Sequence, residues 1–199
     1  MKAFFKKART IIMFPLVLPS MVAFLLSSNK DKIMSDLKRY YVAHSLKWGG
    51  YYNALIICML EGEKAFRNIF YYRVGLYSHL FKIFLPENNT CHITCPDIGS
   101  GLFIQHGDAT YTSAKKIGNN CWVNQCVTIG YKNRDDAPTI GNNVTVSSGA
   151  KIIGKVNIGN NVVIGANAVV VKDVPDNCTV VGVPAYIIKL NGIKCNIQL

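Results

Sequence analysis

Acidic residues are scarce in this sequence: the chain has 11 Asp and Glu against 22 Lys and Arg, a formal net charge of +11 over 199 residues. Such an excess of positive charge suits a negatively charged partner, such as a phosphate-bearing cofactor, an anionic membrane surface or a nucleic acid. The sequence has no RNA- or DNA-binding motif of known spacing, so we rank nucleic acid last and expect no such partner. Intrinsic disorder is excluded, because half of the residues are hydrophobic and only 17% are charged.

The sequence also lacks a disulfide framework and a recognisable metal site. Its seven cysteines are odd in number and form no compact pattern, which favours free thiols in a reducing compartment. Cys91, His92 and Cys95 lie close together, but no second pair follows at the spacing of a zinc finger. We therefore predict a cytoplasmic protein that requires no metal.

No apolar run reaches the roughly 20 residues that a membrane span needs. The run from Ile11 to Leu26 is shorter, and Pro15 and Pro19 interrupt it. Four basic residues precede this run: Lys2, Lys6, Lys7 and Arg9. No small-x-small cleavage site follows it, which disfavours a signal peptide. We favour a segment over residues 1–28 that contacts the inner face of the cytoplasmic membrane, with its lysines toward anionic head groups, and the alternative is a buried helix pair.

Residues 29–88 have the pattern of a helical region. Ser28 could cap a helix over residues 29–46, which residues 48–50 would end. One face of this helix would carry Ile33, Leu37, Tyr40, Tyr41 and His44. A second helix is predicted over residues 61–85, with Phe66, Phe70, Tyr77, Phe81 and Phe84 at helical spacing. We interpret this aromatic stripe as core or subunit contact, and Pro86 marks the end of the helical region.

A branched aliphatic residue returns about every six positions between Ile98 and Val174. The predicted rungs are Ile98, Ile104, Thr110, Ile117, Val123, Ile129, Ile140, Val146, Ile152, Ile158, Ile164 and Val170. A period of six fits short strands joined by recurring turns, and the Gly or Asn that often follows each rung suits those turns. Three rungs make one triangular coil, so twelve rungs predict a mainly β fold, a parallel β-helix of about four coils over residues 89–189, with a tail over 190–199. A sandwich of ordinary strands would not hold one register through so many repeats.

Two features of this repeat are candidates for chemistry. His106 follows the rung at Ile104, at a corner where its imidazole would face a groove and could act as a general base on a hydroxyl. The alternative is a surface histidine that bonds to a neighbouring corner, and Gln125 would lie one coil above it. The charged segment 131–139 leaves the solenoid, either as a solvated loop or as a cover over a substrate beside His106.

Several motifs carry a resemblance to a known family. They are the hexapeptide register, residues 98–106 (IGSGLFIQH), residues 124–130 (NQCVTIG), and the closing VPDN and GVPA at 174–177 and 182–185. Over residues 95–189 the chain resembles the serine acetyltransferase branch of the left-handed β-helix acyltransferases. Residues 66–73 are similar to helical leaders of branch members associated with bacterial surface-polysaccharide synthesis. The resemblance implies a homotrimer or a pair of trimers, acetyl-CoA in the groove between neighbouring solenoids, and His106 as the base for direct attack on the thioester.

Three departures from the family pattern bear on the acceptor. Cys91 stands where the family has the aspartate that orients the histidine, and Asp97 and Asp108 are candidates to replace it. Gln105 stands where the family has an acid, and Asp136 begins the pair that replaces the Arg-His holding the carboxylate of serine. Without those cations the charge-assisted grip on a carboxylate is lost. We therefore predict a sugar hydroxyl as acceptor, with Gln105 and Asp136 near it.

For the coenzyme, the family pattern implies small residues on the later coils, and lysines could attract the phosphates. The candidates are Tyr131, whose backbone amide could bind the oxyanion, with Ser148, Ala166, Lys172 and Lys189. Two other functions stay open: an L-serine O-acetyltransferase that makes O-acetylserine for cysteine biosynthesis, and a non-catalytic scaffold. A zinc carbonic anhydrase on the same fold is weak, because only His106 follows a rung.

Overall fold

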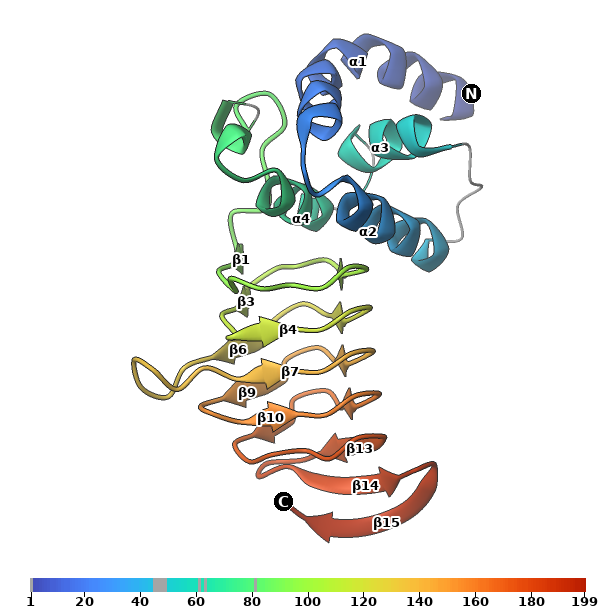
Figure 1. Cartoon of the computed structure of the whole chain (residues 1–199). Coiled ribbons are helices and arrows are strands. Elements are labelled where there is room, and N and C mark those ends of the chain that lie inside the picture. Colours follow the sequence, from blue (N-terminus) through green and yellow to red (C-terminus); the bar gives the residue numbers. More distant parts are fainter. Residues whose placement is uncertain (1, 45–49, 61, 63, 81) are drawn as a thin grey trace. The chain divides into compact units, whose positions relative to one another are not determined.

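The computed structural model describes residues 2–44, 50–60, 62, 64–80 and 82–199. The chain divides into two compact units, residues 1–88 and residues 89–199. The first unit is helical and the second is a β-solenoid (Figure 1). Each is described by itself below.

The helical unit is built from four α-helices and one 3₁₀ helix in its described residues. They are α1 (Lys2–Leu26), α2 (Lys30–Ala43), α3 (Tyr51–Leu60), α4 (Lys64–Val74) and η1 (Gly75–Leu80). Its core joins apolar side chains of α2, α3 and α4, among them Leu37, Leu55, Met59, Phe66 and Ile69. The sequence pattern missed α3 because its run YYNALIICML is apolar on nearly every side and shows no helical period.

Helix α1 corrects one prediction for residues 1–28. Lys2–Leu26 form a single helix with Pro15 and Pro19 inside it, so the alternative of a helix pair is wrong. Val17, Ala23 and Phe24 are buried, and α1 packs mainly against α3. Among the described helices, none is both long and apolar enough to cross a membrane.

The predicted helix over 29–46 is present as α2, with different ends. Asn29 and not Ser28 is the N-cap residue, and the Asn29 amide donates a hydrogen bond to Ser27 Oγ at 3.1 Å. The four apolar and aromatic residues predicted for its buried face are buried, whereas His44 is exposed and stacks on Tyr40. Residues 45–49, which include most of the predicted helix end, lie outside the described residues.

The second predicted helix is split into α4 and η1. Phe66 and Phe70 of α4 are buried as predicted. Tyr77 and Phe84 are 72% and 49% exposed, so the aromatic stripe does not continue as core. Phe81 lies outside the described residues. The helical period therefore holds only as far as Val74, where the α-helix ends.

A buried ion pair joins α2 to α4. The Arg73 guanidinium donates to both oxygens of Asp36, Nε to Oδ2 at 2.8 Å and Nη2 to Oδ1 at 3.3 Å. The two side chains are only 2% and 1% exposed. The side-chain Nδ2 of Asn29 donates to the Arg73 carbonyl at 2.9 Å, so Arg73 also anchors the start of α2.

The solenoid has three parallel faces, here named sheets A, B and C. Sheet A contains β1 (Cys91–Ile93), β3 (Thr110–Thr112), β6 (Thr128–Gly130), β9 (Lys151–Ile153) and β12 (Val169–Val170). Sheet B contains β4 (Lys116–Ile117), β7 (Thr139–Ile140) and β10 (Asn157–Ile158), and single bridges at Ile98 and Val174 extend it. Sheet C contains β2 (Phe103–Ile104), β5 (Trp122–Val123), β8 (Thr145–Val146), β11 (Val163–Ile164) and β13 (Cys178–Val181). The predicted parallel β-solenoid after a helical region is confirmed.

The number of coils is five, one more than predicted. The predicted series began at Ile98 and ended at Val170, which left out the inward positions at Ile93, Val174 and Val180. The predicted rung at Thr110 is also displaced, because Thr112 is the residue that pairs with Ile129. Thr110 and Thr112 are both fully buried. Counting six residues on from Ile104 therefore reaches a buried residue, Thr110, that lies two positions before the residue in register.

Asparagines line the edge between sheets B and C. The Oδ1 atoms of Asn119, Asn142 and Asn160 each accept the amide N–H of the preceding coil, at 2.8–2.9 Å, and Asp176 does the same for Asn160 at 2.7 Å. Gly118 and Gly141 allow this approach, because a Cβ on either would lie within 2.6 Å of a carbonyl in the next coil. A second row, Asn120, Asn143, Asn161 and Asn177, supplies the turns with positive φ.

The chain after the last coil reverses direction. Strand β14 (Tyr186–Leu190) pairs antiparallel with β13, and β15 (Ile193–Gln198) pairs antiparallel with β14. Residues 190–199, which we predict as a tail, are therefore mostly a strand of the solenoid unit.

Candidate active site

His106 stands at a corner between sheets C and A, directly after β2. Eight positions separate the inward residues Ile104 and Thr112 across this corner, whereas six separate Val123 and Ile129 in the coil above. The two extra residues give the corner an irregular backbone, with positive φ at His106, Gly107 and Ala109. The imidazole is exposed, as the sequence predicts, because the corner leaves the regular path of the coil.

The edge between sheets C and A, here called the C/A edge, consists of residues 105–109, 124–127, 147–150, 165–168 and 182–185. Gln125, Ser148 and Ala166 occupy equivalent positions in the coils above His106. Backbone bonds follow this stack, from Gly149 N to the Gln125 carbonyl at 3.1 Å and from Asn167 N to the Ser148 carbonyl at 3.0 Å. At about 4.8 Å per coil, His106 and Ala166 lie roughly 14 Å apart along the edge.

Gln105 is half-buried beside His106 on the C/A edge, whereas the remaining predicted site residues lie elsewhere on the solenoid. Tyr131 and Asp136 belong to the loop after β6, on the edge between sheets A and B, here called the A/B edge, and this loop projects away from the solenoid (Figure 1). Lys172 is on the same edge in the last coil, where its Nζ donates to the Leu199 carbonyl. Lys189 is exposed on β14. Sheet A therefore separates Tyr131, Asp136 and Lys172 from the His106 corner within one chain, whereas Lys189 lies on sheet C.

Asp136 is held within its own loop. Asn133 Nδ2 donates to Asp136 Oδ2 at 2.7 Å, and the Asp136 amide donates to the Asn133 carbonyl at 3.2 Å. Both residues are exposed or partly exposed. The loop thus presents a carboxylate in the place where the family pattern has cations.

The structure separates the two aspartates that we considered as partners of His106. Asp97 lies on the A/B edge, where its carboxylate pairs with Lys116 Nζ at 3.1 Å. Asp108 lies in the same corner as His106, where its Oδ1 accepts a long bond of 3.5 Å from Thr90 Oγ1. Cys91 is 5% exposed and sits in β1 opposite Thr110. Asp108 is therefore the carboxylate of the His106 corner.

Sequence analysis missed several polar groups near this corner. Lys151, whose side chain is on the outer side of sheet A, donates from Nζ to the Cys126 carbonyl at 2.7 Å and to Thr128 Oγ1 at 3.1 Å. Asn124 Oδ1 and Trp122 Nε1 are buried and have no hydrogen-bond partner. Strand pairing brings these groups near the corner, and the sequence alone does not show which residues are paired.

The cysteines do not form a metal site. Within the part of the chain that the structure describes, no three His, Cys, Asp or Glu side chains are grouped to hold a metal ion. None of the seven cysteines forms a disulfide. Burial raises the pKa of Cys95, which disfavours the thiolate that a metal would need.

Comparison with known proteins agrees with this geometry. Residues 137–172 match the family model described as "Bacterial transferase hexapeptide (six repeats)". The match covers the part of the solenoid from the end of the loop after β6 to the last coil. The serine acetyltransferase of Synechococcus elongatus is 43% identical over 101 residues, which are 49% of this chain and 41% of that protein. The chain thus spans less than half of the length of this curated relative.

Solved structures of similar proteins extend over both units. The crystal structure of Neisseria gonorrhoeae serine acetyltransferase in complex with serine is 28% identical, with a TM-score of 0.67 over 85% of this chain and 72% of that one. A serine acetyltransferase in complex with CoA is 26% identical, with a TM-score of 0.59 over 79% of this chain and 68% of that one. The chain is therefore similar to serine acetyltransferases in sequence and in fold.

Proposed function

We propose that this protein is an acetyl-CoA-dependent O-acetyltransferase with His106 as its general base. The observation that carries the proposal is the irregular corner that exposes the His106 imidazole at one end of the C/A edge, in a solenoid with transferase repeats. Similarity to one serine acetyltransferase solved with CoA and to another solved with serine supports it.

In the proposed reaction His106 accepts the proton of an acceptor hydroxyl while the oxygen attacks the thioester carbonyl. The tetrahedral intermediate collapses to the acetyl ester, and the sulfur of CoA leaves with the proton from the imidazolium. No acyl-enzyme is formed. Asp108 is the group we assign to orient the imidazole, in place of the family aspartate at Cys91.

Ser148 and Ala166 are proposed to leave room for the coenzyme along the C/A edge, and Lys172 and Lys189 to attract its phosphates. Lys172 also lines a cleft of about 290 Å³ with Pro184 and Ala185 at the last coil, which suits the anionic end of a nucleotide. The buried Asn124 Oδ1 needs a donor, and an acceptor hydroxyl or a bound water would supply one.

We also propose a homotrimer, and sedimentation of the full chain would show whether trimers pair. Tyr131, Asp136 and Lys172 lie across sheet A from His106, so the site would be complete only when the loop of one copy reaches the C/A edge of its neighbour. Mixing His106→Ala subunits with Tyr131→Pro, Asp136→Ala subunits, which lack the Tyr131 backbone N–H, should then restore activity. For random trimers about a quarter of the sites would hold both intact parts. No recovery after refolding together would contradict the shared site.

Two acceptors have separate support. The similar proteins reported above are serine acetyltransferases, which favours L-serine. The loop favours an acceptor without a carboxylate, such as a sugar hydroxyl, because Asp136 would repel one. The link to surface-polysaccharide synthesis remains a prediction. We place the reaction in the cytoplasm, which the free thiols support.

The deciding experiment is thiol release from acetyl-CoA with serine and a panel of sugars, using the full chain. Turnover with either acceptor class identifies the substrate, and His106→Ala should lower that turnover by about 10²–10⁴-fold. Saturating CoA should also raise the unfolding temperature, since a ligand at 100 times its Kd stabilises by about 2.7 kcal/mol. No turnover and no stabilisation would favour the non-catalytic scaffold.

A further inference from the structure

The helical unit carries an apolar surface on the outside of α1 that its own core does not use. The outer face of α1 consists of Phe14, Leu18, Val22, Leu25 and Leu26. These side chains are between 36% and 82% exposed, and at 3.6 residues per turn they span an arc of about 120°. The buried residues of α1 lie on the opposite side, so the helix is apolar both toward its core and toward solvent. A surface helix of a soluble unit normally has a polar outer side.

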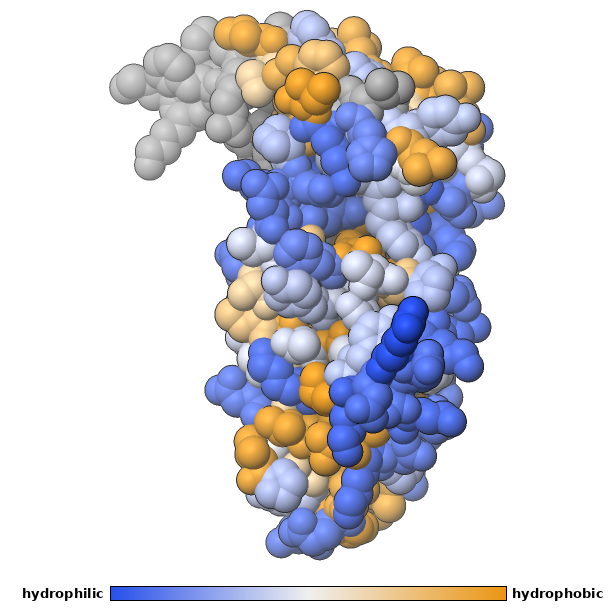
Figure 2. Space-filling model, turned by 90° about the vertical axis from the view of Figure 1, so that its left-hand side faces the viewer, coloured by the Kyte–Doolittle hydropathy of each residue, from blue (hydrophilic) through white to orange (hydrophobic). Residues whose placement is uncertain are grey.

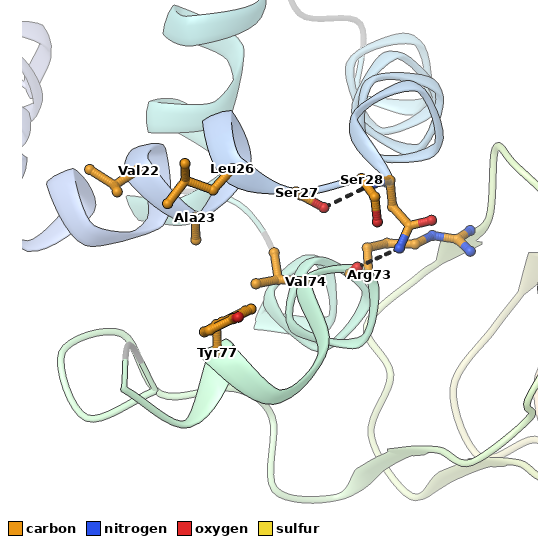
Figure 3. Close-up of a pocket in the computed structure, with 9 residues that line it drawn as sticks. Val22, Ala23, Leu26, Ser27, Ser28, Arg73, Val74 and Tyr77 are labelled. Carbon is orange, nitrogen blue, oxygen red and sulfur yellow. Dashed lines mark hydrogen bonds between the residues drawn. The ribbon is translucent and has the colours of Figure 1, made fainter.

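A pocket continues this face at the end of α1 (Figure 3). It has a volume of about 470 Å³. Val22 and Leu26 of α1 form one wall, and Val74 and Tyr77 form the other. Ser28 and Asn29 line its polar side. Leu76, next to Tyr77, is 85% exposed, and Figure 2 shows hydrophobic side chains exposed over the helical unit.

Positive charge is concentrated in the same unit. Residues 1–88 contain 13 Lys and Arg against five Asp and Glu, whereas residues 89–199 contain nine against six. Helix α1 has no acidic residue, and its first turns carry Lys2, Lys6, Lys7 and Arg9. An apolar helix face joined to a basic segment is the pair of signals that holds a protein on an anionic bilayer.

We propose that the outer face of α1 lies in the interface of an anionic lipid bilayer, with the pocket at Tyr77 receiving part of a lipid. The helix lies along the surface, because no described helix is both long and apolar enough to cross a membrane. A lipid fits better than a second copy of the chain, because two such units would bring like charges together. This inference is independent of the acetyltransferase activity.

Flotation of the full chain with lipid vesicles tests the proposal. The protein should float with vesicles of phosphatidylcholine that contain about one third phosphatidylglycerol, and much less with phosphatidylcholine alone. Raising NaCl from 0.1 to 1 M shortens the screening length from about 10 to about 3 Å and should weaken binding. The double variant Leu18→Glu, Leu25→Glu should lower the bound fraction at least about tenfold, because it places charge in the apolar layer.

The matched control is Val42→Glu, Ile193→Glu, which adds the same charge at residues that are 79% and 73% exposed and lie off this face. It should lose less than about threefold, the part due to charge alone. Circular dichroism of each variant confirms folding. Equal losses in both variants, or no binding of the unmodified chain to anionic vesicles, would overturn the proposal. So would sedimentation showing that only the α1 variant dissociates an oligomer while vesicle binding is unchanged, which would make the face a subunit contact.

Discussion

Removing the carboxylate of Asp36 should unfold the helical unit at a much lower temperature. Asp36 and Arg73 form two hydrogen bonds, at 2.8 and 3.3 Å, and are almost fully excluded from solvent. Asp36→Ala would leave the guanidinium buried without its anion, which costs about 3–5 kcal/mol. In a unit of this size 1 kcal/mol corresponds to about 4–8 °C, so the midpoint should fall by at least about 12 °C.

The assay is thermal unfolding followed by circular dichroism at the helical minimum, which reports the helical unit and not the solenoid. Asp31→Ala is the matched control, because Asp31 is exposed in the first turn of the same helix. It should cost no more than about 1 kcal/mol. Replacing both partners, with Asp36→Leu and Arg73→Met, should restore much of the loss, since no charge is then left buried. A loss below about 1 kcal/mol for Asp36→Ala would refute the reasoning.

Three other predictions concern the site, the solenoid and pH. Asp108→Asn should lower kcat about 10-fold or more and alter its pH profile, while His106→Ala should lose more and show no further loss when the two changes are combined. Asn142→Ala removes the Oδ1 that accepts the Asn119 amide N–H and the Nδ2 that donates to Asn160 Oδ1, and should lower solenoid stability by about 1–3 kcal/mol, measured by urea unfolding. Burial raises the pKa of Tyr71 to about 12, so the folded state keeps a proton that the unfolded chain loses near pH 10. The free energy of unfolding should therefore fall between about pH 10 and 12. Tyr71→Phe should make this pH dependence weaker.

The solenoid could be predicted because its period of six is written in the sequence, but its ends could not. The first and last coils lack clean spacing: Ile93 precedes the regular series, and only four positions separate Val170 from Val174. The insertion at the His106 corner was also hidden, because Thr110 falls in phase by chance while Thr112 holds the register.

The sequence names candidate site residues but does not give their arrangement. His106, Ser148 and Ala166 share one edge because the strands before them pair in register. The insertions between these residues fall at corners and leave that pairing intact. The same pairing puts Tyr131 and Lys172 on another edge. In the helical unit, burial of Asp36 against Arg73 had no local signal, since the two residues are 37 positions apart.

The asparagine row has a direction, and it ends at a carboxylate. The Oδ1 of an asparagine can accept a hydrogen bond from the coil before it, and its Nδ2 can donate one to the coil after it, so the same bonds can repeat from coil to coil. Asp176 has no side-chain proton to donate, and its two oxygens receive both the amide N–H and the side-chain NH₂ of Asn160. Asp176 therefore ends the asparagine row at the last coil. Asp176→Asn would be the first change to make in designing a solenoid with a sixth coil.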